Sequence, residues 1–287
     1  MEENRHVRKS NVFVEGRYRF GVIEQKILLA IISKIRIEDK EFVPYRISWS
    51  DLKEISRDNL TSTRKLDQSC EKLKGKTIKI REGEKQINFG FLSGWTVVPG
   101  AYAEFRIDPG MKEMLLDLLS EGRFTLYNLE CVLSLGSTYS IRMYELLKAK
   151  QYRRKPFYVP LGDLKWILDI DEKSPSHAHF GMFRRLVLEK AKKDLQRHTD
   201  IKFTYKTVKE RRKVVGIEFH VMTNGTYQKT VTALVDKRKF IRDGDTVVIG
   251  GKDFFVQDGC ARDDEGLPIP IGQLNGMLKK GKLFIKL

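Results

Sequence analysis

The chain has 287 residues, and its 54 Lys and Arg against 38 Asp and Glu give a formal net charge of +16. A composition that is 41% hydrophobic and 32% charged is typical of a folded soluble protein and excludes a disordered or fibrous one. The excess of positive charge favours a polyanionic partner, either nucleic acid or an anionic membrane surface.

Three features that the sequence lacks indicate the cellular compartment of the protein. The longest purely aliphatic run, Ile27 to Ile32, is far shorter than the roughly 18 apolar residues that suggest a membrane span. The first ten residues are charged and lack the apolar centre of a secretion signal. The cysteines, Cys70, Cys131 and Cys260, lie far apart, which argues against a disulfide framework or a CxxC metal site. We therefore expect a protein of the reducing cytoplasm with no membrane partner.

Residues 1–16 are predicted to form a polar arm that carries Arg5, Arg8 and Lys9. A basic arm of this kind either enters a DNA minor groove or stays disordered, and the sequence leaves both open.

The next hundred residues predict a mixed series of helices and strands. Apolar spacing and turn residues indicate, in chain order, a helix over 22–35, a strand over 42–49, a helix from Ser50 to about Arg57, a helix capped by Thr61 or Ser62 and ended by Gly75, and a hairpin of 77–81 with 86–92. An extended segment over 103–107 is expected to pair with this hairpin, and a helix over 111–119 follows it.

The same order of elements then begins again. The pattern predicts a helix over 139–152, a strand over 157–159, a helix over 161–168, a helix over 179–197, and strands over 201–205 and 217–221 that residues 209–213 join. The letters repeat as well, because Ser50-Asp51-Leu52-Lys53 corresponds to Gly162-Asp163-Leu164-Lys165.

Helix, strand, helix, helix and hairpin is the order of a winged helix, a helix-turn-helix followed by a β-hairpin wing. The predicted fold class is therefore α+β, with two tandem winged-helix domains over 17–125 and 126–224. Residues 225–287 predict a small β-rich appendage of unknown role, with 11 basic and 8 acidic residues.

The positive charge is concentrated in the second domain. Residues 184–213 hold twelve Lys and Arg against four acids, on one long helix and the hairpin after it. Such a helix fits a major groove, where Arg and Gln read base edges and Lys contacts phosphates, while the wing lies along the backbone. The candidate DNA-binding residues of this domain are Met182, Arg185, Lys192, Lys193, Gln196, Lys206, Lys209, Arg211, Arg212 and Lys213.

The first domain shows a weaker version of the same pattern, diluted by Glu71, Glu82 and Glu84. Its candidate DNA-binding residues are Thr61, Ser62, Thr63, Arg64, Lys65, Gln68, Lys79 and Arg81. The alternative for both domains is a solvated basic surface, but two basic features on one helix-and-hairpin unit favour DNA.

Catalytic patterns are few. His177-Ala178-His179 resembles the metal-binding pair of endonucleases that nick rolling-circle origins, but it lies next to Ser174-Pro175-Ser176 instead of on a central strand. No GxxxxGK[ST], HExxH or GxSxG motif occurs. We therefore expect a DNA-binding protein that has no enzymatic activity, cofactor or metal.

Three segments of the chain resemble the plasmid replication initiators of the Rep_3 type, which bind repeated origin sites called iterons during theta replication. The resemblance covers about residues 10–224. It rests on Glu24-Gln25-Lys26-Ile27-Leu28-Leu29 after Ser10-Asn11, on Ser140 to Lys148, and on Phe183-Arg184-Arg185-Leu186-Val187-Leu188 followed by Ala191 and Thr199-Asp200.

This resemblance implies that both domains bind double-stranded DNA, with the second helix and wing making the strong major-groove contacts. It implies monomers that open the origin and dimers, formed through the first winged helix, that repress the protein's own promoter. It also implies recruitment of the host initiator and the replicative helicase in a bacterial cytoplasm. A winged-helix transcription regulator and, less favoured, a nicking enzyme stay open as alternatives.

Overall fold

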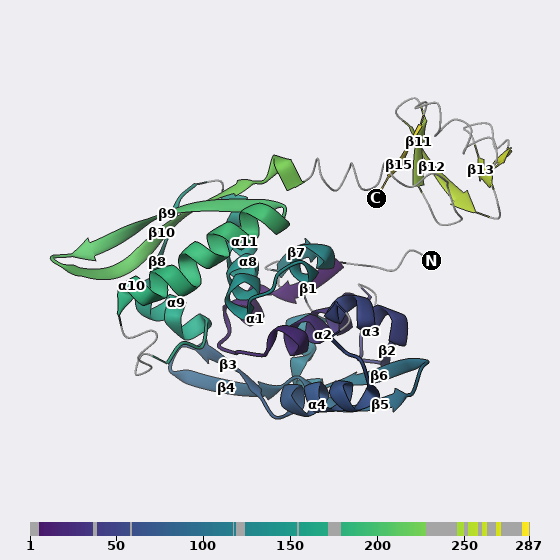
Figure 1. The fold of residues 1–287 in the computed structure, drawn as a ribbon, viewed down its shortest axis with the longest axis horizontal. Helices are drawn as coiled ribbons and strands as arrows, with labels where there is room; N and C mark the ends of the chain where they lie inside the picture. Colours follow the sequence, from purple (N-terminus) through teal and green to yellow (C-terminus); the bar gives the residue numbers. More distant parts are fainter. Residues whose placement is uncertain are drawn as a thin grey trace. The chain divides into compact units, whose positions relative to one another are not determined.

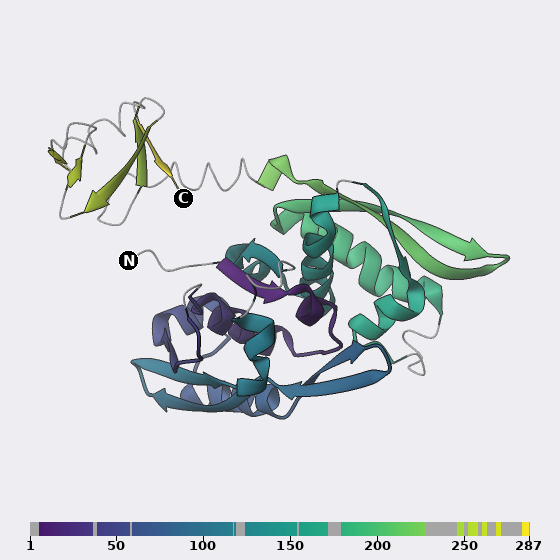
Figure 2. The same cartoon turned by 180° about the vertical axis from the view of Figure 1, so that it is seen from behind.

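The computed structural model describes residues 6–36, 39–57, 59–116, 118, 124–153, 155–171, 179–227, 246–249, 252–257, 260–262, 268–270 and 283–286. The chain divides into two units, one of residues 4–224 and one made mainly of residues 225–287. Figures 1 and 2 show the larger unit as two neighbouring mixed helix-and-strand modules.

The first module follows the predicted order, except that the sequence pattern did not predict the strand over Leu92–Val98. Its elements are α2 (Val22–Ser33), β2 (Tyr45–Ser48), α3 (Trp49–Ser56), α4 (Thr63–Lys74), β3 (Thr77–Glu82), β4 (Lys85–Gly90), β5 (Leu92–Val98), β6 (Tyr102–Ile107), η1 (Pro109–Met111) and α5 (Lys112–Leu115). Serine side chains start two of these helices. The Ser48 hydroxyl accepts from the Asp51 N–H at α3, and the Ser62 hydroxyl accepts from the Lys65 N–H at α4. Ser62, not Thr61, is therefore the cap of α4.

The strand pairing in the first module corrects one prediction. β6 does not pair with the β3–β4 hairpin, which forms a separate two-stranded sheet. Instead β6 lies between β2 and β5 in a three-stranded antiparallel sheet of order β2-β6-β5. By chain order the wing of this module is the β5–β6 hairpin, and β3–β4 is an insertion between α4 and that wing.

The second module repeats the arrangement. Its elements are β7 (Phe124–Asn128), α7 (Leu129–Leu133), α8 (Thr138–Lys150), η2 (Gln151–Arg153), β8 (Phe157–Pro160), α9 (Leu161–Ile167), α10 (Phe180–Phe183), η3 (Arg184–Glu189), α11 (Lys190–His198), β9 (Ile201–Glu210) and β10 (Lys213–Thr223). The sheet order is β8-β10-β9, so in both modules the last strand lies between the other two. This common topology confirms the predicted winged-helix repeat.

The N-terminal segment is not a free arm. Strand β1 (His6–Ser10) pairs antiparallel with β7, and α1 (Asn11–Glu15) follows it, capped by the Ser10 hydroxyl. Lys9 is fully buried, so the suggestion that this residue reaches a minor groove is wrong. Arg5 lies outside the described residues.

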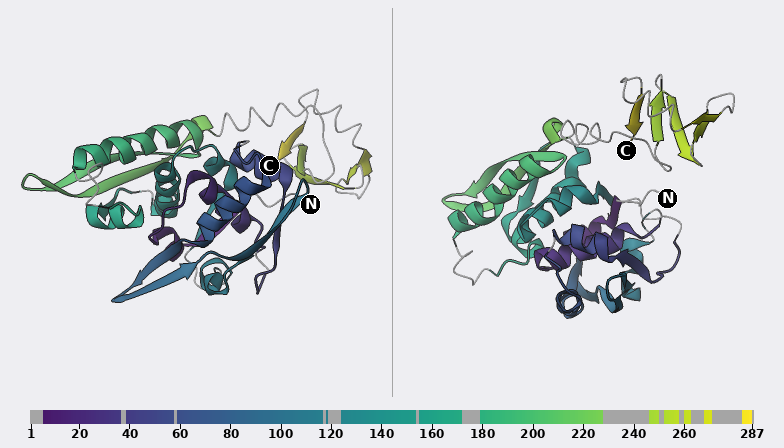
Figure 3. Two further views of the ribbon diagram at one scale, coloured as in Figure 1. Left: turned by 60° about the horizontal axis from the view of Figure 1, so that its bottom comes forward. Right: turned by 45° about the vertical axis from the view of Figure 1, so that its right-hand side comes forward.

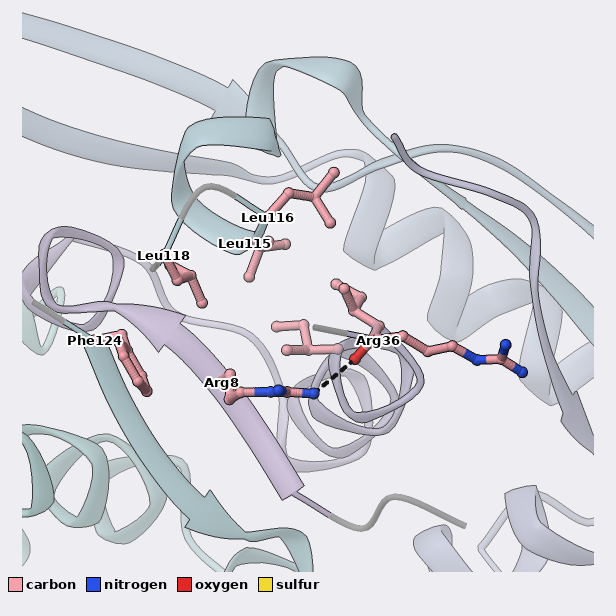
Figure 4. A pocket seen from close by; sticks show the side chains of 8 residues that line it. Arg8, Arg36, Leu115, Leu116, Leu118 and Phe124 are labelled. Carbon is pink, nitrogen blue, oxygen red and sulfur yellow. Dashed lines mark hydrogen bonds between the residues drawn. The ribbon is translucent and has the colours of Figure 1, made fainter. Parts of the chain in front are cut away.

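Arg8 is also engaged within the fold. Its guanidinium donates to the Ile35 carbonyl oxygen at 3.2 Å, and the side chain borders a cavity of about 20 Å³ beside Leu115, Leu118 and Phe124 (Figure 4). A cavity of this size holds about one water molecule, so it is too small for an organic ligand.

Charged side chains lie in the centre of the larger unit. Lys9 and Arg142 both pair with Glu145, and all three are at most 1% exposed. Arg142 also donates at 2.8 Å to the carbonyl oxygens of Val14 and Gly16, and its guanidinium lies over the Tyr18 ring. The network thereby ties the N-terminal segment to α8 of the second module.

The C-terminal unit contains a five-stranded antiparallel sheet, as a β-rich appendage would. Its strand order is β14-β13-β12-β11-β15. The strands are β11 (Thr246–Ile249), β12 (Lys252–Gln257), β13 (Cys260–Arg262), β14 (Pro268–Pro270) and β15 (Leu283–Lys286).

Within the described ranges, no helix combines the length and apolar character that crossing a membrane requires.

Candidate nucleic-acid interface

One continuous helix, built from α10, η3 and α11 over Phe180–His198, carries most of the candidate residues; we call it the reading helix. It buries Phe183, Val187, Leu188, Ala191 and Leu195 against the second module. Phe180, at the start of the helix, is only half-buried. The predicted outer face is largely solvent-accessible, since Arg185, Lys193 and Gln196 are exposed and Met182 and Lys192 are half-buried.

The middle of the reading helix is not α-helical. Arg184–Glu189 forms a π-helical segment, in which backbone bonds join residues five apart. In an α-helix, side chains three and four apart are neighbours. Here the Arg184 Nε lies 3.7 Å from a Glu189 oxygen, five residues on. The π segment therefore changes which side chains share a face of the helix. A sequence pattern interpreted with the uniform period of an α-helix does not select Arg184 as a site residue.

The strands of the wing are longer, and the turn between them is shorter, than predicted. β9 and β10 extend to Glu210 and Lys213, so only Arg211 and Arg212 form the turn, instead of residues 209–213. Arg211 has φ 54°, in the left-handed region. Figures 1 and 3 show the hairpin running alongside the reading helix and projecting beyond its α10 end. The side chains of Lys206, Lys209, Arg211, Arg212 and Lys213 are all exposed.

A basic hollow joins the wing to the helix-turn-helix. Its lining contains five cationic side chains and no carboxylate: Lys165, Arg184, Lys209, Arg212 and Lys213. Like charges are held close together here, so the hollow favours an anion such as a phosphate. Lys165 was not among the residues predicted from the sequence, although it belongs to the repeated segment Gly162-Asp163-Leu164-Lys165 on α9. Its place in the hollow beside the wing depends on the tertiary fold, which the sequence pattern does not give.

The first module presents a milder surface. Arg64, Lys65 and Gln68 are exposed on α4, and Thr61 and Ser62 are exposed just before it, whereas Thr63 is half-buried. The hollow on α4 contains two acids, Asp67 and Glu71, beside Arg64, Gln68 and Lys72. Asp67 also accepts from the Trp95 indole N–H at 3.0 Å, which links α4 to β5.

The β3–β4 hairpin lies at the contact between the modules. The backbone of Lys79 exchanges two hydrogen bonds with that of Arg17, at 2.8 and 2.9 Å. The Arg81 guanidinium lies over the Trp166 ring of α9, with 4.2 Å between its carbon and the ring centroid. The Arg17 Nε lies 2.6 Å from an Asp169 oxygen just after α9. Lys79 and Arg81 are therefore joined to this contact, while their role toward DNA stays a prediction.

Of the candidate metal pair, the structure describes His179, whereas His177 lies outside the described residues. Among the residues that are described, no group of three or more His, Cys, Asp or Glu could hold a metal ion. The Cys70 and Cys131 side chains are buried.

Two winged helices, each with a helix and hairpin on one unit, define a tandem winged-helix protein of the nucleic-acid-binding class. Two family models match the sequence: "Initiator Replication protein, WH1" over residues 6–148 and "Initiator Rep protein, WH2" over residues 160–221. The chain therefore belongs to the initiator replication protein family, as the sequence resemblance predicted.

A solved structure supports the fold. The crystal structure of Pi initiator protein in complex with iteron DNA is 16% identical, and the match covers 78% of this chain and 98% of that chain with a TM-score of 0.63. A structure of domain 2 and domain 3 of RctB is 13% identical and covers 62% of this chain and 73% of that chain, but its TM-score of 0.38 supports no argument. No curated protein matches the sequence.

Proposed function

We propose that this protein is a plasmid replication initiator that binds repeated double-stranded origin sites, the iterons, and promotes opening of the neighbouring DNA. The observation that carries the proposal is the exposed basic face of the reading helix next to the basic wing. Membership of the initiator family and the fold shared with an initiator solved on iteron DNA support it.

The proposed mechanism is binding without bond-making. Arg185 and Gln196 read base edges in the major groove, Lys192 and Lys193 contact phosphates beside them, and the wing residues Lys206, Lys209, Arg211, Arg212 and Lys213 follow the backbone. Strain from several bound copies promotes melting of an A·T-rich segment. The protein acts in the bacterial cytoplasm, and it needs no cofactor for this step.

The first module adds a second, weaker contact through α4. A dimer formed through this module represses the protein's own promoter, and the monomer recruits the host initiator and replicative helicase. These parts of the proposal rest on the family membership, and the mixed charge around α4 supports a weaker DNA contact there.

Footprinting of the full chain on DNA that flanks its own gene tests the proposal. We expect protection of direct repeats at helical-turn spacing. If roughly eight phosphates are neutralised, the slope of log affinity against log salt is about −7. A slope near −2 on a cognate repeat would contradict an interface that uses both modules.

Two variants separate base reading from phosphate contact. Arg185→Ala is expected to reduce discrimination between cognate and random DNA by about 1–3 kcal/mol, whereas Arg212→Ala weakens both equally. Equal losses on both DNAs for Arg185→Ala would remove its base-reading role.

A winged-helix transcription regulator without an initiator role has the same two modules, so binding alone does not distinguish the two functions. Replication of an origin fragment in cells supplied with the protein does. A nicking enzyme would instead cut supercoiled origin DNA with Mg²⁺ or Mn²⁺ and lose this activity in His177→Ala.

A further inference from the structure

An exposed carboxylate lies within the basic interface. The described part of the reading helix carries two acids, Glu189 and Asp194. Asp194 accepts from the Ser140 hydroxyl of α8 at 2.6 Å and lies 3.6 Å from the Lys190 Nζ. Asp194 is therefore committed to the contact between α8 and α11, whereas Glu189 lies at the end of the π segment on the side of β9.

Glu189 is held in place by the wing strand. Its Oε1 accepts from the Tyr205 hydroxyl at 2.6 Å, and Arg184 lies 3.7 Å from the same oxygen. Desolvation and the hydrogen bond to Glu189 raise the pKa of Tyr205, so the phenol stays protonated and remains the donor. The π segment makes this arrangement possible because it brings positions 184 and 189 onto one face.

One oxygen of this fixed carboxylate is available. Within the described residues, Oε1 makes the contacts above and Oε2 has no partner, while the side chain is 46% exposed. A carboxylate accepts through both oxygens, so Oε2 retains its full acceptor capacity. The hollow around it is otherwise lined by Arg184, Lys192, Tyr205, Lys206 and Thr207.

A negative charge in this position weakens binding to phosphate, because it opposes the cations that attract the DNA backbone. The carboxylate favours DNA binding only where it accepts from a hydrogen-bond donor. The donors in the major groove are the exocyclic amino groups of bases. Such a carboxylate raises specificity in two ways. It strengthens binding to sites that present a base amino group, and its repulsion of phosphate weakens binding to all other DNA.

We propose that Glu189, positioned by Tyr205, is a specificity-determining residue that accepts a hydrogen bond from the N4 amino group of a cytosine in the major groove. This inference rests on the proposed DNA-binding function and adds a residue that the basic pattern alone does not select. Tyr205 acts as a positioning residue, because its hydroxyl fixes the carboxylate without needing to contact DNA.

Glu189→Gln in the full chain tests the inference, since it preserves shape and removes the charge. We expect affinity for random duplex DNA to rise about three-fold or more, and the ratio of cognate to random affinity to fall about ten-fold, in the range of one lost base contact. On a panel of repeats with single base changes, the preference for cytosine at one position is lost while other positions keep theirs.

Asp194→Asn is the matched control, because it makes the same charge change on the same helix at a residue held by α8. It is expected to raise cognate and random affinity by the same factor and to leave the base preference intact. Tyr205→Phe keeps the charge of Glu189 but frees its side chain, so it should weaken the cytosine preference with little change in random affinity. Melting temperatures confirm that each variant is folded.

The outcomes distinguish failure of the proposed role of Glu189 from failure of the proposed DNA-binding function. If Glu189→Gln and Asp194→Asn raise both affinities alike and no position loses its cytosine preference, Glu189 contributes charge only and the inference is wrong. If the wild-type protein shows no preference for any repeat near its gene, the proposed function itself fails.

Discussion

At the scale of single residues, the most consequential feature is the buried group of Lys9, Arg142 and Glu145. Two cations and one carboxylate leave the group with an excess positive charge in a region shielded from water. Burial lowers the pKa of Lys9 to about 8, although Glu145 opposes this shift, and despite its own burial the pKa of Glu145 is lowered by the two cations. Removing one partner of a buried pair costs about 3–5 kcal/mol, because it strands the other charge.

Lys9→Met therefore has an effect that depends on pH. The folded pKa of Lys9 lies below its ordinary value of 10.5, so between pH 8 and 10.5 the unfolded chain binds more protons. The wild-type free energy of unfolding should thus gain a contribution from Lys9 as pH rises through this window.

We expect the stability difference, wild type minus Lys9→Met, to grow by on the order of 1–3 kcal/mol between pH 7.5 and pH 10. Urea unfolding at the two pH values measures it, with Lys65→Met as a control at an exposed lysine. Parallel pH profiles for wild type and Lys9→Met would contradict the lowered pKa.

Burial of this kind could not be predicted from the sequence. Lys9 lies in a charged stretch that reads as a polar arm, and its partner Glu145 is on a helix more than a hundred residues away. A local pattern reports how polar a segment is but not which distant carboxylate neutralises it. The same limit explains why the sequence did not select Lys165 and Arg184, since the hollow that contains them is formed by α9, the reading helix and both strands of the wing.

At the scale of elements, sequence patterns were most informative where structure is local. The helices around residues 22–35, 139–152 and 179–197 and the order of the winged-helix repeat follow from apolar spacing and turn residues. The pairing of β6 with β2 is non-local, and alternation in 103–107 fits several partners equally well. Its local partner β5 was not identified as a strand from the sequence. The π segment also escapes prediction, because apolar periodicity does not identify an extra residue in one turn.

The turn of the wing offers a test at this scale. Arg211 occupies the left-handed region, which costs a bulky residue about 1 kcal/mol, while Arg212 does not. Arg211→Gly relieves this strain but makes the unfolded chain more flexible, so we expect its free energy of unfolding to match wild type within about 1 kcal/mol.

Arg212→Gly is the matched control, because it removes the same charge without relieving strain and should be less stable than Arg211→Gly. Both variants should lower affinity for cognate and random DNA equally, and reduce the steepness of the salt slope by about 1. Chemical unfolding and fluorescence anisotropy measure these effects. Equal destabilisation by the two glycines would show that the turn carries no strain at Arg211.

At the scale of the whole molecule, the two modules are connected by more than a linker. The N-terminal segment contacts both of them. Arg142 of α8 donates to its carbonyls and Arg17 pairs with Asp169, while the Arg17 backbone exchanges hydrogen bonds with Lys79 of β3. The inserted β3–β4 hairpin extends the contact to α9 through Arg81 and Trp166. We expect these contacts to restrain the distance between the reading helix and α4, and so to set which spacing of DNA contacts both modules reach together.

Trp166→Leu tests this coupling without changing the charge of either module. Arg81 loses the aromatic face beneath it, a contact worth about 0.5–2 kcal/mol, while every cationic side chain remains available to DNA. If the contact restrains the spacing, affinity for the natural repeat should fall about five-fold, and affinity for a repeat lengthened by one base pair between the two contacted segments should change little.

The informative quantity is thus the ratio of the two affinities, measured by anisotropy at one salt concentration. Tyr152→Leu is a suitable control, because Tyr152 is an aromatic residue on η2 of the second module that is 71% exposed; its removal should leave the ratio unchanged. An equal loss on both repeats in Trp166→Leu would mean that the contact stabilises the fold but does not set the spacing. A reduced ratio of natural-repeat to lengthened-repeat affinity would show that the β3–β4 insertion sets the spacing between two DNA-binding modules.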